Sequence, residues 1–561
     1  MKIFKIFYLV LIFINIDAVY NNNSTQCGTD KLKIKPRMIN IENKVKISSI
    51  SKETSDPYTP ISIGYDFTTL EMPYTMSSST FYKIRSILKD TREEFSKILQ
   101  IQHKSIDLSD DLNDIMEACE LSTIGEDYPN FLMKNDLIIF PMFEKLEPGV
   151  LAAASPCLIG QNNHPYGGIL YINSDLDFGK INTELYIKNL FFHEITHILA
   201  FHPYFFEKLH MMERSGTLYY ITSKKVIEKA KEHFNCNTLT QIQLENHGGG
   251  GSAGSHWESR YMLGDYMIST DYPDVAISDI TLALFEDTHF YKVNYYSGGL
   301  FKFGKNKGCG FFNTKCIINE KAVFDDFCDV EDKPMCSSSR ALKSSCFLVY
   351  HLYNIPSQYQ YFSDKTRGGF PTASYCPVPY DSYTSSYYYY PNHCQVGISQ
   401  LPDDYGEIIG NQSFCFMSSL LPNNSTEILT SNIPICYEIE CNTTKKRIIL
   451  KIGSENVTCP TNGGIVSKVP GFNGTLECPK YNDICLENDT FVCNEMYSCF
   501  TALANKNNYS YEIDYYDFIG DPAEISYNNE TNEVIYPIKL TGYNIKLNIK
   551  LLIFSLFMLF I

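Results

Sequence analysis

The sequence predicts an α+β protein: a mixed β-sheet and a long apolar helix in the N-terminal half, followed by a cysteine-rich, β-rich C-terminal region. Short apolar runs at 136–142 and 168–172 have the length and composition of buried strands. Residues 184–201 repeat apolar side chains at helical spacing, and fifteen of the nineteen cysteines lie between Cys309 and Cys499. A chain of 561 residues, 44% hydrophobic, is long enough for two to four domains.

The remaining elements follow from the same periodicities. Residues 60–67 alternate apolar and polar side chains, which is typical of a strand. Residues 80–102 repeat apolar side chains at helical spacing and carry their charges on one side. Downstream, residues 223–234 indicate an amphipathic surface helix, and residues 277–286 indicate another helix. Strands and helices therefore interleave before the cysteine-rich region begins.

The N-terminus has the pattern of an exported protein. A short basic start, an apolar run and a small-residue neighbourhood at Ala18 predict a secretory signal peptide at 1–18, with a retained membrane anchor as the alternative. Residues 19–56 are polar and lysine-rich, the composition of a pro-segment. In an exported chain the cysteines indicate a disulfide framework rather than a thiolate metal cluster, and Cys119 and Cys157 are candidates for a pair.

The long helix contains the motif His-Glu-x-x-His at 193–197. Residues four apart lie on one face of a helix, so His193 and His197 can bind one metal ion while Glu194 stands beside it as a base. A zinc ion that catalyses hydrolysis needs three protein ligands and one position open to water. The interpretation therefore requires a third ligand elsewhere in the chain.

The candidate third ligand is His256, which follows a run of glycines at 248–251. Such a run lets the chain bend back sharply toward the metal. Other histidines of this part of the chain lack that context; they are His202, His210, His233 and His247. Met267 lies eleven residues beyond His256 and, on residue type alone, is a core methionine that fills a gap.

The combination of His-Glu-x-x-His with a distant Gly-Ser-His-Trp-Glu-Ser-Arg and a later methionine resembles the leishmanolysin family of metzincin zinc endopeptidases. Similar stretches occur at 147–157, 167–173 and 283–287, and the resemblance covers most of residues 57–500. It implies a metzincin-type catalytic domain, with a long insert between the second and third ligands. The implied substrates are proteins or peptides.

The resemblance also implies roles for individual residues. One Zn²⁺ per chain would be held by His193, His197 and His256. Glu194 would be the general base, and Met267 would form a Met-turn beneath the three imidazoles. The family pattern has glycine three residues after the second histidine, where this chain has Ala200. If that position requires a positive φ, alanine costs about 1 kcal/mol.

The resemblance further implies a zymogen in which a pro-segment cysteine blocks the zinc. Cys27, the isolated cysteine near the N-terminus, is the candidate for this switch because a thiolate would occupy the open coordination position. The alternative is that Cys27 pairs with another cysteine or stays free.

Glycan acceptors and an apolar tail mark the last third of the chain. Residues 551–561 are apolar but too few to span a bilayer, and the small residues at 541–544 before them fit a glycolipid-anchor signal. A marginal transmembrane tail that starts near Tyr543 is the alternative. The Asn-x-Ser/Thr acceptors include Asn411, Asn424, Asn442, Asn456, Asn473, Asn488, Asn508 and Asn529.

These boundaries predict six segments. They are a signal peptide (1–18), a pro-segment (19–56), an N-terminal catalytic subdomain with the zinc helix (57–200), an insert with the third ligand and the Met-turn (201–308), a cysteine-rich, glycosylated C-terminal domain (309–540), and a glycolipid-anchor signal or short hydrophobic tail (541–561).

The sequence thus predicts a secreted or cell-surface zinc endopeptidase, anchored in the outer leaflet of the membrane and acting in cell adhesion or surface proteolysis. A net charge of −17 and the absence of a long basic run argue against a nucleic-acid partner. The alternative is a catalytically inactive surface glycoprotein of the same fold that acts in adhesion. Ala200 and the many glycan acceptors are the features that favour it.

Overall fold

The computed structural model describes most of residues 57–485. The gaps within this stretch are 103–104, 107–111, 122–133, 177, 179–183, 248–252, 271, 273–274, 296–300, 381–391, 396, 398, 400 and 403–404. Outside it, residues 36–39, 45–46, 497, 500–501, 513, 515–518, 526–528 and 533–535 are described. The predicted signal peptide, Cys27, the apolar tail, Asn488, Asn508 and Asn529 lie outside the described residues.

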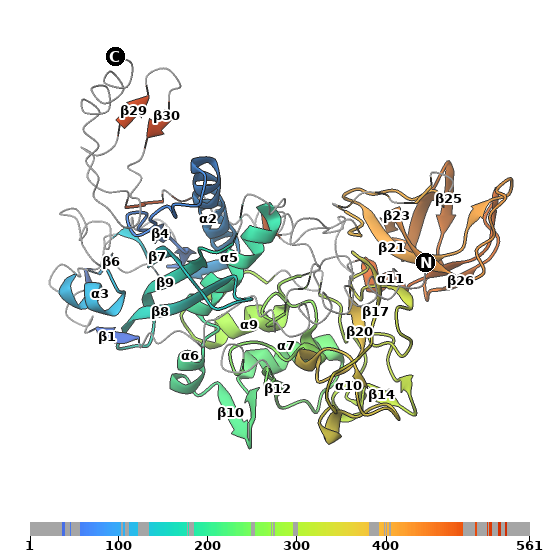
Figure 1. The fold of residues 1–561 in the computed structure, drawn as a ribbon, viewed down its shortest axis with the longest axis horizontal. Helices are drawn as coiled ribbons and strands as arrows, with labels where there is room; N and C mark the ends of the chain where they lie inside the picture. Colours follow the sequence, from blue (N-terminus) through green and yellow to red (C-terminus); the bar gives the residue numbers. More distant parts are fainter. Residues whose placement is uncertain are drawn as a thin grey trace, which may run out of the picture.

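A five-stranded mixed sheet forms the centre of the N-terminal half (Figure 1). Its order is β1-β8-β9-β7-β4. The parallel strands are β4 (Ile63–Tyr65), β7 (Leu137–Glu144) and β9 (Pro165–Asn173), while β8 (Ala152–Gly160) runs antiparallel to β9. β1 (Arg37–Ile39) pairs in parallel with the outer edge of β8, so a strand from the predicted pro-segment belongs to this sheet.

Successive side chains of a strand point to opposite faces of the sheet, and here both sets are apolar. Helices therefore cover both faces. Leu170 and Ile172 of β9 pack into the core beneath α2 (Ser78–Ile98) and α5 (Glu184–Leu199). Ile169 and Tyr171 point the other way and pack in a second cluster with α3 (Leu112–Ala118). The Cys119–Cys157 disulfide lies in this second cluster and joins the end of α3 to β8, as predicted.

Gly168 of β9 lies directly beneath α5. A Cβ atom built at this position would be 2.3 Å from Cγ2 of Ile198, inside the helix's last turn. The helix therefore approaches the strand to a distance that only glycine permits. This contact sets the depth at which α5 lies on the sheet.

Replacing Gly168 with alanine is expected to lower the free energy of unfolding by about 1–3 kcal/mol, because the methyl group forces α5 away from β9. Chemical denaturation measures the change. Gly410→Ala is the matched control, because a Cβ atom there meets nothing within 4 Å. Equal stability of the two variants would contradict the close packing of α5.

The part of the chain that follows α5 consists of short elements. These are α6 (Pro203–Lys208), β10 (Met212–Ser215), β11 (Leu218–Ile221), α7 (Lys224–Phe234), β12 (Ile242–Gln243), α8 (Ser259–Met262), α9 (Asp279–Asp287) and β13 (Lys292–Val293). The helices predicted at 223–234 and 277–286 are α7 and α9. Asp287 of α9 accepts hydrogen bonds from the first backbone N–H groups of α7, which fixes the two helices together.

The cysteine-rich part of the chain is β-rich, as predicted. It begins with α10 (Gly310–Asn313) and small sheets formed by β14 (Ile317–Ile318), β15 (Lys321–Ala322), β16 (Pro334–Cys336), β17 (Lys343–Phe347), β18 (Val349–Tyr350), β19 (Arg367–Gly368) and β20 (Val378–Tyr380). A six-stranded antiparallel sheet follows, in the order β25 (Glu455–Thr458), β24 (Arg447–Ile452), β23 (Ile433–Asn442), β21 (Ser413–Ser418), β28 (Leu476–Cys478) and β26 (Gly464–Val466). It has its own hydrophobic core.

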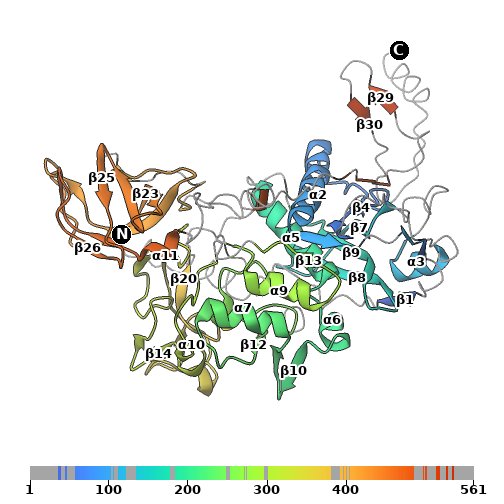
Figure 2. The same ribbon diagram turned by 180° about the vertical axis from the view of Figure 1, so that it is seen from behind.

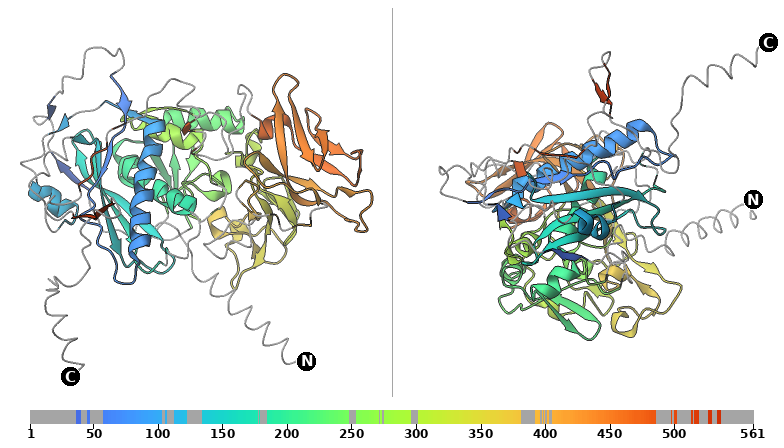
Figure 3. Two further views of the ribbon diagram at one scale, coloured as in Figure 1. Left: turned by 90° about the horizontal axis from the view of Figure 1, so that it is seen from above. Right: turned by 90° about the vertical axis from the view of Figure 1, so that its left-hand side faces the viewer.

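This six-stranded sheet lies at the opposite end of the molecule from the five-stranded sheet, as Figures 2 and 3 show from behind and from above. Minor elements complete the described chain: β2 (Val45–Lys46), β3 (Thr59–Pro60), β5 (Leu99–Ile101), β6 (Ser105–Ile106), β22 (Leu421–Pro422), β27 (Phe472–Asn473), α11 (Tyr481–Ile484), β29 (Ser526–Asn528) and β30 (Glu533–Ile535). Of the helices in the described part of the chain, none has both the length and the apolar character to cross a bilayer.

Disulfides connect the cysteine-rich part internally and to the α7 segment. Besides Cys119–Cys157, the bonds between described cysteines are Cys236–Cys309, Cys316–Cys376, Cys328–Cys346, Cys336–Cys415, Cys394–Cys436, Cys441–Cys485 and Cys459–Cys478. The predicted disulfide framework and the α+β class are both confirmed.

Candidate metal centre

The centre is built on α5, whose second half is entirely buried. Phe192, next to the first motif histidine, stacks on Phe95 of α2 with ring centroids 4.2 Å apart. The small residues Ala152 and Ala154 of β8 belong to the same hydrophobic core as this half of α5. Apolar packing around α5 therefore holds the backbone of the motif rigidly and leaves its histidines on one face.

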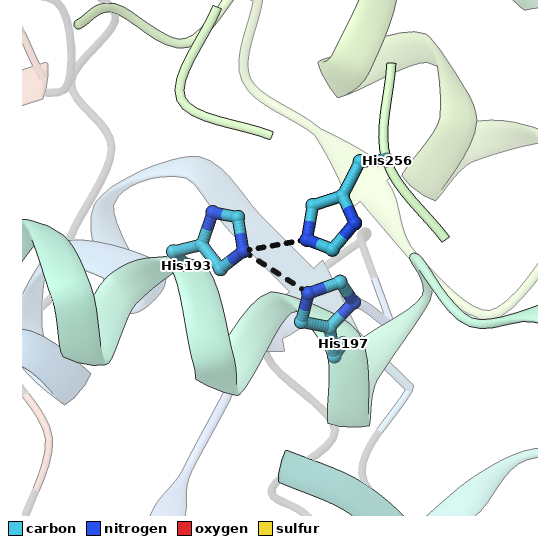
Figure 4. Close-up of side chains that lie close together, drawn as sticks. All are labelled: His193, His197 and His256. Atoms are coloured by element: carbon cyan, nitrogen blue, oxygen red, sulfur yellow. Dashed lines mark hydrogen bonds between the residues drawn. The ribbon is translucent and has the colours of Figure 1, made fainter. Parts of the chain in front are cut away.

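Three imidazoles from two distant segments converge at this face (Figure 4). The Nε2 atoms of His193 and His197 are 3.1 Å apart, and those of His193 and His256 are 3.2 Å apart. Two nitrogen ligands of a tetrahedral zinc ion, each about 2.0–2.1 Å from the metal, lie roughly 3.3 Å apart. The spacing of the three nitrogens thus fits a shared metal ion.

The hydrogen bonds of the outer ring nitrogens determine the tautomers of the helix pair. Nδ1 of His193 lies 2.6 Å from the carbonyl oxygen of Tyr266, and Nδ1 of His197 lies 2.6 Å from that of Phe201. A carbonyl can only accept, so both Nδ1 atoms carry the proton. Burial lowers the pKa of His193 to about 4 and that of His197 well below its usual value, so the rings are neutral.

Two neutral rings in these tautomers direct unprotonated Nε2 lone pairs at each other across 3.1 Å. Neither nitrogen can donate a hydrogen bond to the other, and their lone pairs repel unless a cation lies between them. The donor set therefore fits a divalent metal, and neutral imidazole is also the form that zinc binds. Among the described residues, this trio is the one group of three or more such side chains close enough to share an ion.

The chain matches the leishmanolysin peptidase family over residues 84–491. It belongs to the leishmanolysin family. It is 27% identical over 384 residues to a leishmanolysin homolog of Crithidia fasciculata, in a match that covers 65% of this chain and 57% of that protein. It is 26% identical over 374 residues to leishmanolysin of Leishmania major, covering 63% and 60%. It is 30% identical over 312 residues to a leishmanolysin-like peptidase of Caenorhabditis elegans, covering 48% and 46%.

The matched stretch is therefore less than two thirds of the length of each of these relatives. At the level of the family, this membership supports a metalloprotease of the leishmanolysin type. The convergent histidines lie within the stretch that matches the family, between residues 84 and 491.

A tight turn around Met267 joins α5 to the segment that carries His256. The carbonyl of Tyr266 accepts the hydrogen bond from His193, and the Tyr266 hydroxyl lies 2.8 Å from Oγ1 of Thr196 on α5. The carbonyl of the buried Met267 accepts a 2.9 Å hydrogen bond from the backbone N–H of Trp257. The turn that the leishmanolysin resemblance placed beneath the imidazoles thus contacts both segments.

Asp265 holds this turn in shape. One carboxylate oxygen accepts from the backbone N–H of Met267, and the other accepts from the backbone N–H of Ser278 and the hydroxyl of Thr281. Burial raises the pKa of Asp265 to about 6, while these three donors act in the opposite direction. Sequence reasoning missed Asp265 and Tyr266. Their only signal was their position directly before the methionine.

The segment that carries His256 is fixed on both sides. The His256 carbonyl accepts a 2.8 Å hydrogen bond from the N–H of Glu245, whose own carbonyl accepts from Gly254. Gly254 has φ of 83°, a conformation that favours glycine and reverses the chain direction before the histidine. Next to His256, the indole N–H of the buried Trp257 donates to Thr281 of α9.

Two glutamates, Glu194 and Glu258, lie close in sequence to the three histidines. Glu194 is completely buried on α5, between the two motif histidines in sequence. Glu258, two residues after His256, accepts a 2.9 Å hydrogen bond from Ser374 of the cysteine-rich part, and burial raises its pKa well above the usual value. Glu258 thus links the His256 segment to the disulfide-bonded region.

The remaining histidines of the insert have other partners. Nδ1 of His202 accepts the backbone N–H of Tyr204 and caps α6, while Nε2 of His233 lies 2.9 Å from the carbonyl oxygen of Phe303. His247 packs edge-on against Tyr359, with centroids 4.9 Å apart. His210 adopts a left-handed conformation at the turn after α6. None of them belongs to the convergent trio among the described residues.

Ala200 does not have a positive φ, so the strain considered for it does not arise. Its N–H and that of Phe201 both bond to the carbonyl of Thr196, at 3.0 and 2.9 Å, which tightens the last turn of α5. The chain then leaves the helix with the Phe201 carbonyl directed to His197. The departure from the family pattern therefore leaves the candidate centre intact.

Proposed function

We propose that this chain is a zinc endopeptidase with one Zn²⁺ held by His193, His197 and His256, and with Glu194 as its general base. The proposal rests mainly on one observation: two neutral imidazoles on α5 direct their Nε2 lone pairs at the same point, where a third ring meets them. Membership of a metalloprotease family supports it.

Held by His193, His197 and His256, a zinc ion would lower the pKa of a water molecule and polarise the carbonyl of the scissile peptide bond. The carboxylate of Glu194 accepts a proton from the water as its oxygen forms a bond to the carbonyl carbon. Glu194 then gives that proton to the departing amine as the C–N bond breaks. The carbonyls of Tyr266 and Phe201 hold His193 and His197 in the tautomer that presents Nε2 to the metal.

We propose further that the protein is exported and acts at the cell surface, on protein or peptide substrates and in adhesion. The eight disulfides among the described residues fit folding in an oxidising compartment. Glycans at Asn411, Asn424, Asn442, Asn456 and Asn473 would coat the β-rich end of the molecule. A glycolipid anchor on the C-terminal tail and a Cys27 switch in the pro-segment complete the proposal.

Chelation tests the metal dependence. The purified, processed protein is expected to hydrolyse a denatured protein substrate, to lose this activity in a chelator such as 1,10-phenanthroline, and to regain it on addition of Zn²⁺. Metal analysis should find about one zinc per chain. A chain that binds zinc but never cleaves would instead be the inactive adhesion glycoprotein. That alternative has lost the support of a strained Ala200.

A further inference from the structure

We infer that described residues after α11 (Tyr481–Ile484) pack on the catalytic half and position the metal-binding helix, with Tyr497 as a positioning residue. We call the described residues Tyr497, Phe500 and 515–518 the C-terminal strap. The inference concerns the structural support of α5; its activity and cobalt readouts rest on the proposed function, whereas its hydrogen-exchange readout does not. Nothing in the sequence pattern of the strap indicates this role.

The first anchor of the strap lies on the turn of α5 that precedes His193. The hydroxyl of Tyr497 donates a 2.8 Å hydrogen bond to Oδ1 of Asn189. The ammonium of Lys188 lies 4.1 Å from the centre of the Tyr497 ring and 2.6 Å from a carboxylate oxygen of Glu94 on α2. A cation between a ring and a carboxylate, both largely shielded from water, ties the strap, α5 and α2 together.

The same anchor reaches the metal centre through Phe192. The rings of Tyr497 and Phe500 pack against Phe192, with centroids 5.6 and 6.1 Å away. Phe192 also contacts the ring of Tyr266 at 5.2 Å. Because Phe192 precedes His193 and the Tyr266 carbonyl accepts its Nδ1–H, the strap supports both groups that orient this imidazole.

The second anchor covers an edge of the central sheet. The N–H of Phe518 donates to the carbonyl of Tyr65 at 2.9 Å, and the N–H of Phe67 donates to the carbonyl of Phe518 at 2.8 Å. These bonds occupy the outer side of β4, the edge opposite to β1. Asp517 accepts from the backbone N–H of Tyr65 and forms an ion pair with the buried Arg92 of α2.

The two anchors therefore contact α5 and α2. Residues separated by 308 and 425 positions in the chain make these contacts, and Tyr497 and Phe500 are almost completely buried. A segment that only stabilised the fold could pack anywhere on the core. This one packs on the turn next to a metal-binding histidine, so its loss should change the geometry of the centre as well as stability.

The test compares Tyr497→Ala with Tyr497→Phe in the processed, metal-loaded protein. Loss of the ring is expected to lower kcat about 10- to 100-fold with little change in KM, because small misplacements of a catalytic group have costs of that size. Cobalt(II) substituted for zinc should show an altered visible absorption spectrum, and amide hydrogens of 192–199 should exchange faster. The phenylalanine variant keeps the packing on Phe192 and loses only the hydrogen bond to Asn189, so it should show much smaller changes than Tyr497→Ala in all three.

Tyr437→Ala is the matched control, because Tyr437 is equally buried but belongs to the six-stranded sheet. It should lower the Tm without altering the cobalt spectrum. If Tyr497→Ala does not fold, Asn189→Ala removes the same hydrogen bond from the α5 side and should produce a smaller shift of the spectrum. A wild-type spectrum and wild-type exchange in α5 for Tyr497→Ala or, failing that, Asn189→Ala would overturn the inference. A wild type that binds metal but is inactive would refute the proposed function and still leave the cobalt-spectrum and exchange comparisons valid.

Discussion

Replacing Glu194 with glutamine is expected to abolish peptide-bond hydrolysis while zinc stays bound. Glutamine has the shape of glutamate but cannot take up the proton of the attacking water. General base catalysis contributes about 10²–10⁴-fold, so kcat should fall by at least this factor. Because Glu194 is completely buried, an isosteric change also avoids the cavity that alanine would leave. Turnover of a denatured protein substrate and zinc content of the same sample measure the two effects.

Glu407→Gln is a suitable control for the glutamate substitution. The side chain of Glu407 is also buried, but it lies in the cysteine-rich part. There its Oε1 forms an ion pair with Nζ of Lys343 at 2.8 Å. Its replacement should lower stability and leave kcat unchanged. Substantial hydrolysis by the Glu194 variant at full zinc occupancy would show that another group takes the proton, and the mechanism proposed for α5 would then be wrong.

His256→Ala is expected to lose both the metal and the activity. Altering only the outer hydrogen-bond partner of a ligand histidine costs about 10- to 100-fold in metal affinity, so removing a ligand should exceed about 100-fold. Two imidazoles on α5 would remain, but a catalytic zinc site needs three protein ligands. Competition with a chromophoric chelator measures the affinity, and the same preparation is assayed for cleavage.

His247→Ala provides the comparison for His256. His247 lies nine residues earlier, on the other side of the glycine run, and packs against Tyr359 rather than joining the trio. Its loss should leave the zinc affinity unchanged. If the His256 variant bound zinc as tightly as the His247 variant, some other side chain would have to complete the pair on α5, and the third ligand would need to be reassigned.

Local periodicity explains why much of the fold could be predicted. The strand expected at 136–142 is β7 (Leu137–Glu144), and the apolar run at 168–172 lies inside β9 (Pro165–Asn173). The helix expected at 80–102 ends earlier, at Ile98, because Leu99–Ile101 pairs with β3 and β13 as β5. Pairing with distant strands overrides a helical pattern that would otherwise continue.

The sequence by itself determined that two imidazoles share a face of one helix and that His256 follows a bend. These properties depend on residue type and on spacings of a few residues, and both can be read directly from the sequence. Only the tertiary structure decided which carbonyls orient the rings, because every residue has a carbonyl and Tyr266 and Phe201 carry no mark of that role. The tertiary structure also decided that Tyr497 packs against Phe192, since a contact across about three hundred positions depends on how every intervening element packs.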